Sequence, residues 1–592
     1  MLTRQQFDVL HYCATHSDRT QRDVAKSTGM SLGSVNAAMR QLKGEGLIEG
    51  NGALSAAGER ALEPYKVDNA VIMAAGLSSR FAPISFERPK GVLKVKGEVL
   101  IERQIRQLHE AGIDEVIVVV GYMKEQFFYL EDEFDVTIVV NPDYAVRNNN
   151  STIMRVADRL GNTYICSSDD YFTENPFERY VFGSYYAGVY AEGETDEYCL
   201  VTKGKEKSIV DVTVGGHDAW YMLGHAYWDR SYSEEFVRIL QEIYDQPATA
   251  DMLWEDVYRF HVDRLHMVLR EYPAGVIWEF DSLSDLQAFD SEFIDNVDSS
   301  IMDNICRVLG CARSEIRDIA PIKQGLTNLS FRFYVDGKGF VYRHPGAGTD
   351  AIINRASEAA SQEVGKRLGL DTTYIYEDSD AGWKISRYVE GADILDYRNW
   401  GQVESAMKMV RTLHDCGVDT GFRYDMHSAT KDMIGMLDAA ERTAFKDFEQ
   451  LFATADGLNE KAMEHGGRIC LCHNDFYSPN FLVTDTSMDL IDWEYSGMSD
   501  YASDLGVFIC CSEHYTYEDA LRCLRLYFGG DPEPEDLFHC VAYVCVISFY
   551  WFVWALYKDS CGDPVGEWLY LWYRCAKEYG ALATAMANEL GY

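Results

Sequence analysis

The sequence predicts a multidomain chain in which a small helical module is followed by an α/β unit and then by an α+β unit of two lobes. A chain of 592 residues is too long to fold around one hydrophobic core. Short apolar segments alternate with a helical pattern over residues 71–167, which is typical of a sheet with helical crossovers. From about residue 300, a hairpin pattern and a helix precede a mainly helical stretch. We expect domains at residues 1–66, 67–296 and 297–592, the last with a small lobe to about 392 and a large lobe from about 393.

The first 65 residues have the pattern of three short helices and a hairpin. Thr20 and Ser31 each precede a helical segment as a cap, and glycines between residues 44 and 52 supply turns. This pattern resembles a winged helix-turn-helix module of the kind found in bacterial regulators. Seven basic and seven acidic residues balance within it, so it lacks the basic stripe that DNA binding normally requires. We expect a docking or regulatory role here, and nucleic-acid binding through residues 1–66 is the less favoured alternative.

The composition favours a soluble cytoplasmic protein. A formal net charge of −40 repels nucleic-acid backbones and is compatible with a cationic substrate. Fifteen scattered cysteines without a C-x-x-C pair predict neither a zinc site nor a disulfide framework. Residues 541–557 form an uncharged run at the lower limit for a membrane span, but aromatic residues are spread along its whole length. We therefore expect a buried helix there and no membrane association.

A glycine turn follows the first apolar segment of the α/β unit. Residues 75–80 read Ala-Gly-Leu-Ser-Ser-Arg, and Lys90 follows ten residues after Arg80. Small residues at the end of a strand let backbone N–H groups approach a triphosphate, and the two cations neutralise it. The turn therefore predicts nucleotide binding.

Two carboxylate segments later in the unit predict a metal site. Asp169 follows the apolar segment 164–167, and Asp281, with Glu279, follows another short apolar segment. Mg²⁺ in nucleotide sites prefers one or two carboxylates together with phosphate oxygens and water. We expect Asp169 and Asp281 to bind it, with Glu279 close by.

Residues 68–295 resemble the bacterial phosphocholine cytidylyltransferases, members of the sugar-phosphate nucleotidyltransferases with a Rossmann-like mixed sheet. The resemblance rests on residues 74–80, 89–90, 121–127, 148–149, 168–171, 254 and 278–282. It implies that the phosphate of phosphocholine attacks the α-phosphate of CTP and releases pyrophosphate. Ser78 departs from the family, which usually has glycine there. The resemblance implies catalytic roles for Arg80 and Lys90, nucleotide binding by Ala75, Gly76, Ser78, Ser79 and Gly121, and phosphocholine binding by Asn149, Tyr198 and Trp254. Tyr227 is a further candidate for phosphocholine binding because it is an aromatic residue in the same half of the unit.

Aromatic residues in the second half of this unit are candidates for a cation pocket. A quaternary ammonium binds to aromatic faces, and Glu255 or Asp256 would supply a nearby acid. Core packing is the competing interpretation for each aromatic residue. Trp254 and Tyr198 are preferred for the pocket because the resemblance reaches them.

The last unit contains the pattern of a phosphoryl-transfer site. Asp475 and Asn480 are five residues apart in the segment 473–480, and Asp492 follows after a short apolar segment. This spacing matches the catalytic loop of protein kinases, where one acid orients the attacking hydroxyl and the asparagine and second aspartate hold the metal. We expect Asp475 to be catalytic and Asn480 and Asp492 to bind Mg²⁺.

Upstream residues complete the expected nucleotide site of this unit. A loop at residues 324–328 combines glycine with hydroxyl and amide groups, and Arg343 ends the next strand. Glu358 on the following helix is the expected ion-pair partner of Arg343. Residues 300–592 resemble the choline and ethanolamine kinases, which have a two-lobed protein-kinase-like fold. The resemblance implies nucleotide binding by Gly325, Thr327, Asn328, Arg343 and Glu358, and choline binding by Glu494, Trp551 and Trp554.

The two resemblances point to consecutive reactions. Choline and ATP give phosphocholine, and phosphocholine and CTP give CDP-choline, with Mg²⁺ expected at both sites. Two alternatives remain open. The same chemistry could act on ethanolamine or a sugar, or the chain could be a winged-helix transcription regulator whose enzyme-derived domains are sensors.

Overall fold

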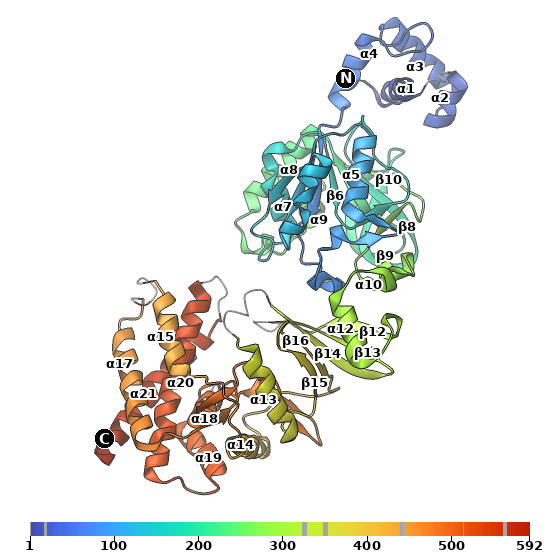
Figure 1. Cartoon of the computed structure of the whole chain (residues 1–592). Coiled ribbons are helices and arrows are strands. Elements are labelled where there is room, and N and C mark those ends of the chain that lie inside the picture. The colour runs from blue at the N-terminus through green and yellow to red at the C-terminus, as the bar shows by residue number, and fades with distance from the viewer. Residues whose placement is uncertain are drawn as a thin grey trace. The chain divides into compact units, whose positions relative to one another are not determined.

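The computed structural model of the chain forms two compact units, Met1–Asn304 and Ile305–Tyr592 (Figure 1). It describes residues 2–16, 20–322, 328–346, 353–438, 442, 444–512, 514–560 and 565–592, without the side chains of Ser79 and Asn328. The predicted phosphate-loop residues Gly325 and Thr327 lie outside the described residues, as do those two side chains.

The N-terminal module is a winged helix, as predicted. Its helices are α1 (Arg4–Thr15), α2 (Gln21–Thr28), α3 (Leu32–Gly44) and α4 (Ala56–Leu62), and an antiparallel bridge joins Ile48 to Leu54. The Thr20 and Ser31 hydroxyls cap α2 and α3 by accepting hydrogen bonds from backbone N–H groups. Helix α4 was not predicted.

Aromatic packing joins this module to the α/β domain of the same unit. Val181 N donates a hydrogen bond to Tyr65 O at 2.8 Å. The Phe182 ring lies 5.6 Å from that of Tyr65 and 5.4 Å from that of Phe7, centroid to centroid. Such aromatic pairs add to the energy of apolar burial, so the module has a specific docking surface within its own unit.

The α/β domain is built on a mixed seven-stranded sheet in the order β10-β8-β9-β6-β1-β4-β5. Strands β1, β4, β5 and β6 are parallel, whereas β9 runs antiparallel to β6 and β8. The seven strands are β1 (Asn69–Ala74), β4 (Val116–Val120), β5 (Thr137–Val140), β6 (Thr163–Ser167), β8 (Tyr185–Lys203), β9 (Ser208–Trp228) and β10 (Val268–Glu271). Two separate pairs are formed by β2 (Lys94–Val95) with β3 (Glu98–Val99) and by β7 (Asp170–Phe172) with β11 (Ile277–Glu279).

Helices cover both faces of this sheet (Figure 1). Ile72 of β1 packs with α5 on one face, and its neighbour Val71 packs with α7, α8 and α9 on the other. Strands that are buried on both faces have continuous apolar sequences, and β1 and β4 could therefore be predicted as strands from the sequence. The helices of the domain are α5 (Leu100–Glu110), α6 (Tyr129–Phe134), α7 (Asn150–Arg155), α8 (Arg230–Ile243), α9 (Trp254–Phe260), α10 (Leu283–Phe289) and α11 (Phe293–Asn296). The division between the two units falls within the next helix, α12 (Ser300–Leu309).

The second unit has the predicted two lobes. The small lobe is an antiparallel sheet in the order β12-β13-β14-β16-β15 with helix α13 (Arg355–Arg367). Its strands are β12 (Arg317–Pro321), β13 (Asn328–Val335), β14 (Lys338–Pro345), β15 (Tyr374–Asp378) and β16 (Trp383–Arg387).

The large lobe is mainly helical and carries two short strand pairs. Its helices are α14 (Trp400–His414), α15 (Met426–Met436), α17 (Phe448–Gly466), α18 (Ala502–Cys510), α19 (Tyr517–Phe528), α20 (Pro534–Ser560) and α21 (Trp568–Leu590). Strands β17 (Ile469–Cys472) and β20 (Gly497–Asp500) pair, as do β18 (Phe481–Val483) and β19 (Met488–Leu490).

Helix α20 contains the long apolar run. Its length and composition would suffice to cross a membrane, but most of it is buried inside the unit, against α17, α18 and α21 among others. This burial confirms the predicted core helix.

Candidate active sites

A cavity of about 540 Å³ lies at the carboxyl ends of the parallel strands of the first unit. Parallel α/β sheets bind ligands at this edge. The predicted residues that line the cavity are Ala75, Gly76, Ser78, Arg80, Lys90, Asn149, Asp169 and Asp281.

The glycine turn is shaped by its neighbours. Gly121, at the end of β4, packs against the turn, since a Cβ atom there would lie 2.8 Å from Ala75 O. Ser78 has a φ of +52°, in the left-handed region where glycine is favoured. The structure therefore gives a physical reason for the glycine expected at this position, and the serine adopts the same conformation at some cost.

Two ion pairs connect the predicted cations to the predicted metal ligands. Lys90 pairs with Asp169 inside the cavity, and Arg80 Nη2 lies 3.4 Å from Asp281 Oδ1. Burial alone would raise the pKa of Asp169, but the charge of the Lys90 ammonium and the hydrogen bonds from Lys90 and Ser167 together lower it. Asp169 is therefore ionised, as a metal ligand must be.

The two carboxylate segments lie side by side because β7 and β11 pair. Asp170 is directly opposite Glu279 in this antiparallel pair. Burial, and then the neighbouring carboxylates of Asp169 and Asp281, raise the pKa of Glu279 to about 8. This crowding of negative charge is the environment that a divalent cation would relieve, so the residues fit Mg²⁺.

The predicted aromatic pocket of this unit is only partly assembled. Trp254 is 1 % exposed and packs between Trp228 and Tyr186. Tyr227 is fully buried in the core on the opposite face of the sheet from Trp254. Consecutive strand residues point to opposite faces, so Tyr227 and Trp228 cannot face the same core. We therefore leave Tyr227 out of the site.

Glu255 is the acid that lies beside the cavity. Its carboxylate accepts hydrogen bonds from Asn149 Nδ2 at 3.3 Å and from the Tyr186 hydroxyl at 3.4 Å. Tyr198 instead donates to Asp256 at 2.8 Å. The sequence suggested Glu255 or Asp256 and missed Tyr186, which carries no motif. Glu255, Asn149 and Tyr186 are thus the polar groups available for a cationic head.

Glu255 should make folding stability depend on pH. Burial raises its pKa from 4.5 to about 7, so the folded state holds a proton that the unfolded state releases. The corresponding stabilisation is complete below pH 4.5 and is lost as the pH rises through 7. We expect the free energy of unfolding of Glu255→Gln, measured in urea, to exceed that of wild type at pH 8 by on the order of 2 kcal/mol. At pH 5, where wild-type Glu255 is protonated, this difference should be smaller.

A matched control is Glu242→Gln on α8, whose side chain is exposed. It should follow the wild-type pH dependence. If the stability of Glu255→Gln has the same pH dependence as that of wild type, Glu255 is ionised in the folded protein and the prediction that it is protonated there is wrong.

The second unit brings together the three residues of its predicted catalytic loop. Asn480 Nδ2 donates to Asp475 Oδ2 at 2.7 Å and to Asp475 O at 2.8 Å. Burial, and then the carboxylate of Asp492, raise the pKa of Asp475 well above its usual range. Asp475 and Asp492 are therefore close enough to repel each other, and Mg²⁺ between Asn480 and Asp492 would relieve this repulsion.

Arg343 connects the small lobe to this loop. Its Nη1 lies 2.6 Å from Glu358 and 3.3 Å from Asp492. Glu494, predicted to bind choline, lies 3.8 Å from the same guanidinium and is 5 % exposed. Lys384, opposite Arg343 on β16, also donates to Glu358 at 3.3 Å. The sequence missed Lys384 because it belongs to no motif.

An aromatic cluster lies beside Asp475. Trp551 contacts Trp554 and Tyr495, with ring centroids 5.4 and 6.5 Å apart. The Tyr424 and Tyr550 hydroxyls lie 3.0 Å apart. Chiefly burial, with a contribution from Asp475, raises the pKa of Tyr424 to about 12. The aromatic faces of this cluster can bind a quaternary ammonium group next to Asp475, the candidate base. The sequence analysis did not identify Tyr424 or Tyr550 as members of the cluster.

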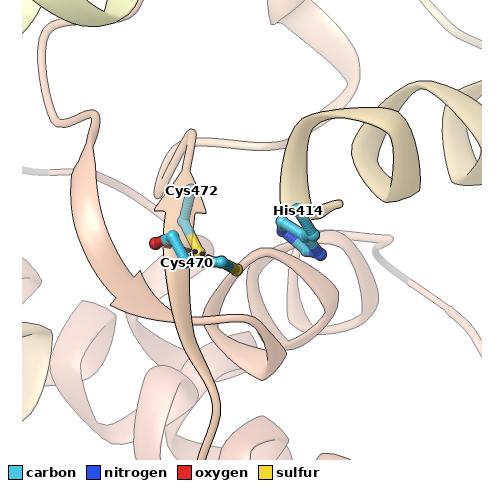
Figure 2. A group of neighbouring side chains, drawn as sticks. All are labelled: His414, Cys470 and Cys472. Atoms are coloured by element: carbon cyan, nitrogen blue, oxygen red, sulfur yellow. Dashed lines mark hydrogen bonds between the residues drawn. The ribbon is translucent and has the colours of Figure 1, made fainter. Parts of the chain in front are cut away.

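His414, Cys470 and Cys472 form a compact group behind this site (Figure 2). Both ring nitrogens of His414 have partners, since Nδ1 lies 2.9 Å from the Tyr527 hydroxyl and Nε2 lies 3.0 Å from Asp504. Asp504 also accepts hydrogen bonds from the backbone N–H groups of His473 and Asn474. A metal ion here would have to displace one of these bonds, so we interpret the group as a brace for the catalytic loop.

The fold and the two sites define a transferase with two nucleotide-binding units. Residues 70–169 match the MobA-like NTP transferase domain, residues 318–535 the phosphotransferase enzyme family, and residues 2–53 the MarR family. The choline-phosphate cytidylyltransferase of Streptococcus pneumoniae is 33 % identical over 216 residues, covering 36 % of this chain and 94 % of that protein. The chain therefore belongs to the cytidylyltransferases with a MobA-like NTP transferase domain, and it carries phosphotransferase-family and MarR-family domains in addition.

Two further similarities were found. The 2-aminoethylphosphonate cytidylyltransferase of Lancefieldella rimae is 34 % identical over 230 residues, covering 38 % of this chain and 93 % of that protein. The crystal structure of choline kinase LicA from Streptococcus pneumoniae is 24 % identical, with a TM-score of 0.41, and covers 48 % of this chain and 97 % of that chain.

Proposed function

We propose that the chain makes CDP-choline in two steps. The second unit transfers the γ-phosphoryl group of ATP to choline, and the first transfers CMP from CTP to the resulting phosphocholine. One observation carries this proposal. The same chain contains both kinds of site. In one, Asp475 and Asn480 form a phosphoryl-transfer loop beside an aromatic cluster; the other is a cavity in a cytidylyltransferase domain that is lined by ion pairs between cations and carboxylates. The product of the first reaction is then the acceptor of the second.

In the kinase reaction, Asp475 orients the choline hydroxyl and accepts its proton as the oxygen forms a bond to the γ-phosphorus of ATP. The bond from that phosphorus to the bridging oxygen breaks, and ADP leaves. Asn480 and Asp492 would hold Mg²⁺, which neutralises phosphate charge when bound. Arg343, fixed by Glu358, contacts the phosphates. The cluster around Trp551 binds the trimethylammonium group, whose apolar methyl groups and positive charge both suit aromatic faces.

In the cytidylyl transfer, an oxygen of the phosphocholine phosphate forms a bond to the α-phosphorus of CTP, and the bond from that phosphorus to pyrophosphate breaks. Backbone N–H groups at Ala75, Gly76 and Ser78, with Arg80 and Lys90, bind the triphosphate. Asp169 and Asp281 would hold Mg²⁺, with Glu279 beside them. No protein nucleophile is required, because the acceptor supplies one.

A second candidate acceptor is 2-aminoethylphosphonate, favoured by the relative from Lancefieldella rimae. A phosphonate carries its phosphorus on carbon and needs no kinase to make it an acceptor. The kinase domain on this chain therefore favours a phosphate ester, made from choline or from ethanolamine.

We also propose three domains with the boundaries given above, a cytoplasmic location where ATP and CTP are available, and a docking role for residues 1–66. The aromatic contacts of Phe7 and Tyr65 with Phe182 support that role.

The substrates can be tested directly with the purified full-length chain. We expect choline with ATP and Mg²⁺ to give phosphocholine, and phosphocholine with CTP to give CDP-choline, each identified by mass. Ethanolamine, a hexose, phosphoethanolamine, 2-aminoethylphosphonate and UTP are the competing substrates. Faster transfer of CMP to the phosphonate than to any phosphate ester would overturn the choline assignment, and activity with neither nucleotide would favour a regulator.

A further inference from the structure

We propose that Arg147 binds the phosphoryl group of the acceptor in the cytidylyl-transfer cavity. The inference rests on the proposed function, because it requires an acceptor with a phosphate or phosphonate group. In this proposal, Arg147 binds the acceptor, whereas Arg80 and Lys90 bind the triphosphate of CTP.

Three cations line the cavity, and Arg147 differs from the other two. Lys90 and Arg80 are each paired with a carboxylate that is expected to bind Mg²⁺. Within the described part of the chain, the Arg147 guanidinium makes no ion pair. Its positive charge is therefore available to an anion that enters the cavity.

The Arg147 guanidinium is nevertheless held in place. Its Nη2 donates to Tyr244 O at 2.7 Å, and its central carbon lies 3.8 Å from the centroid of the Tyr244 ring. Its Nε is buried and has no hydrogen-bond partner. A planar guanidinium that is stacked and has a buried donor still unsatisfied is preorganised for an oxyanion, which it can bind with two N–H groups.

The loop that carries Arg147 is attached to the segment that carries Glu255. Asn148 N donates to Ala250 O at 2.8 Å, and Asn149 Oδ1 accepts from Trp254 N at 2.7 Å. Asn149 Nδ2 reaches Glu255 at 3.3 Å. Arg147 is thus two residues before Asn149, whose side chain contacts Glu255, the acid proposed to lie beside the cationic head of the acceptor.

This position suits the acceptor better than the triphosphate. The phosphate and the quaternary nitrogen of phosphocholine are separated by only two carbons and an ester oxygen, so both ends must bind near each other. Arg80, Lys90 and the glycine turn already supply cations and N–H groups for CTP. An acceptor phosphate must also approach an anionic nucleotide, and a guanidinium on two of its oxygens reduces the repulsion and leaves the third free to attack.

The test compares Arg147→Met and Arg147→Lys with Arg155→Met in the full-length chain. Arg155 is exposed, pairs with Asp143 at 2.7 Å and does not line the cavity, so it is a matched control. For Arg147→Met we expect the KM for phosphocholine to rise about 10- to 100-fold while the KM for CTP changes less than about twofold. Arg147→Lys should recover part of this loss, and Arg155→Met should match wild type.

Calorimetric binding of phosphocholine and of choline to each variant gives a second readout. Arg147→Met should weaken phosphocholine binding and leave choline binding unchanged. A selective rise in the KM for CTP, or equal effects of Arg147→Met and Arg155→Met, would overturn the inference. Wild-type protein that transfers CMP to no phosphate or phosphonate would instead contradict the proposed function.

Discussion

Asp475→Ala should reduce ATP-dependent phosphorylation of choline by about 10²- to 10⁴-fold, the range expected when a general base is removed. Asp475 is 8 % exposed and is fixed by Asn480 at 2.7 Å beside the aromatic cluster, where the choline hydroxyl would lie. The loss should fall on kcat, since the residues proposed to bind the trimethylammonium group and the nucleotide are unchanged. Phosphocholine formation at saturating choline and ATP is the measurement.

The same variant should still convert supplied phosphocholine and CTP to CDP-choline at the wild-type rate. Asp485→Asn, an exposed acid between β18 and β19, is the control for a general effect of removing charge from this lobe. Loss of both activities in Asp475→Ala would show that the two sites are not independent, and retention of kinase activity would remove Asp475 from the mechanism.

The parts of both sites that could be predicted from sequence are those set by local geometry. Asp475 and Asn480 meet because they are only five residues apart in the sequence and the 3-10 turn Ser478–Asn480 brings the amide back to the carboxylate. Asp169 reaches the glycine turn because β1 and β6 are parallel neighbours, and parallel neighbours end at the same edge. In each case a motif and one rule of chain geometry were sufficient.

The aromatic residues could not be assigned in this way. Tyr227 and Trp254 look alike in the sequence, and only the register of β9 shows that Tyr227 faces the core opposite to that of Trp254. Tyr424 meets Tyr550 across 126 residues of chain, from a short loop before α15. Whether an aromatic residue lines a pocket or fills a core depends on long-range packing, which no local pattern encodes.

The same limit applies to Arg147 and Lys384. Neither residue belongs to a motif, although Arg147 directly precedes one, and the place of each beside a site follows from contacts with strands or segments that are distant in the sequence. Arg147 is placed by one hydrogen bond to Tyr244 O and by stacking on the Tyr244 ring, and Lys384 is placed by the pairing of β14 with β16. The role of such a cation can be assigned only when the residues that surround it in the fold are known.

Asp281→Ala should reduce cytidylyl transfer by about 10²- to 10³-fold, the loss typical of removing one group that stabilises charge in a transition state. Asp281 lines the cavity and lies 3.4 Å from Arg80, and its side chain is 45 % exposed, so its removal should not unfold the domain. The initial rate of CDP-choline formation from CTP and phosphocholine is the measurement, with choline phosphorylation expected to be unchanged.

The cause of the loss can be identified by titrating Mg²⁺. If Asp281 is a metal ligand, the variant should need more Mg²⁺ for half-maximal activity and should recover part of its rate at high Mg²⁺, because one of two carboxylates remains. Asp263→Ala, an exposed acid of the same domain, should show the wild-type Mg²⁺ dependence. An unchanged Mg²⁺ requirement with a raised KM for CTP would mean instead that Asp281 acts by orienting Arg80 on the triphosphate, and the metal would then be held by Asp169 and Glu279.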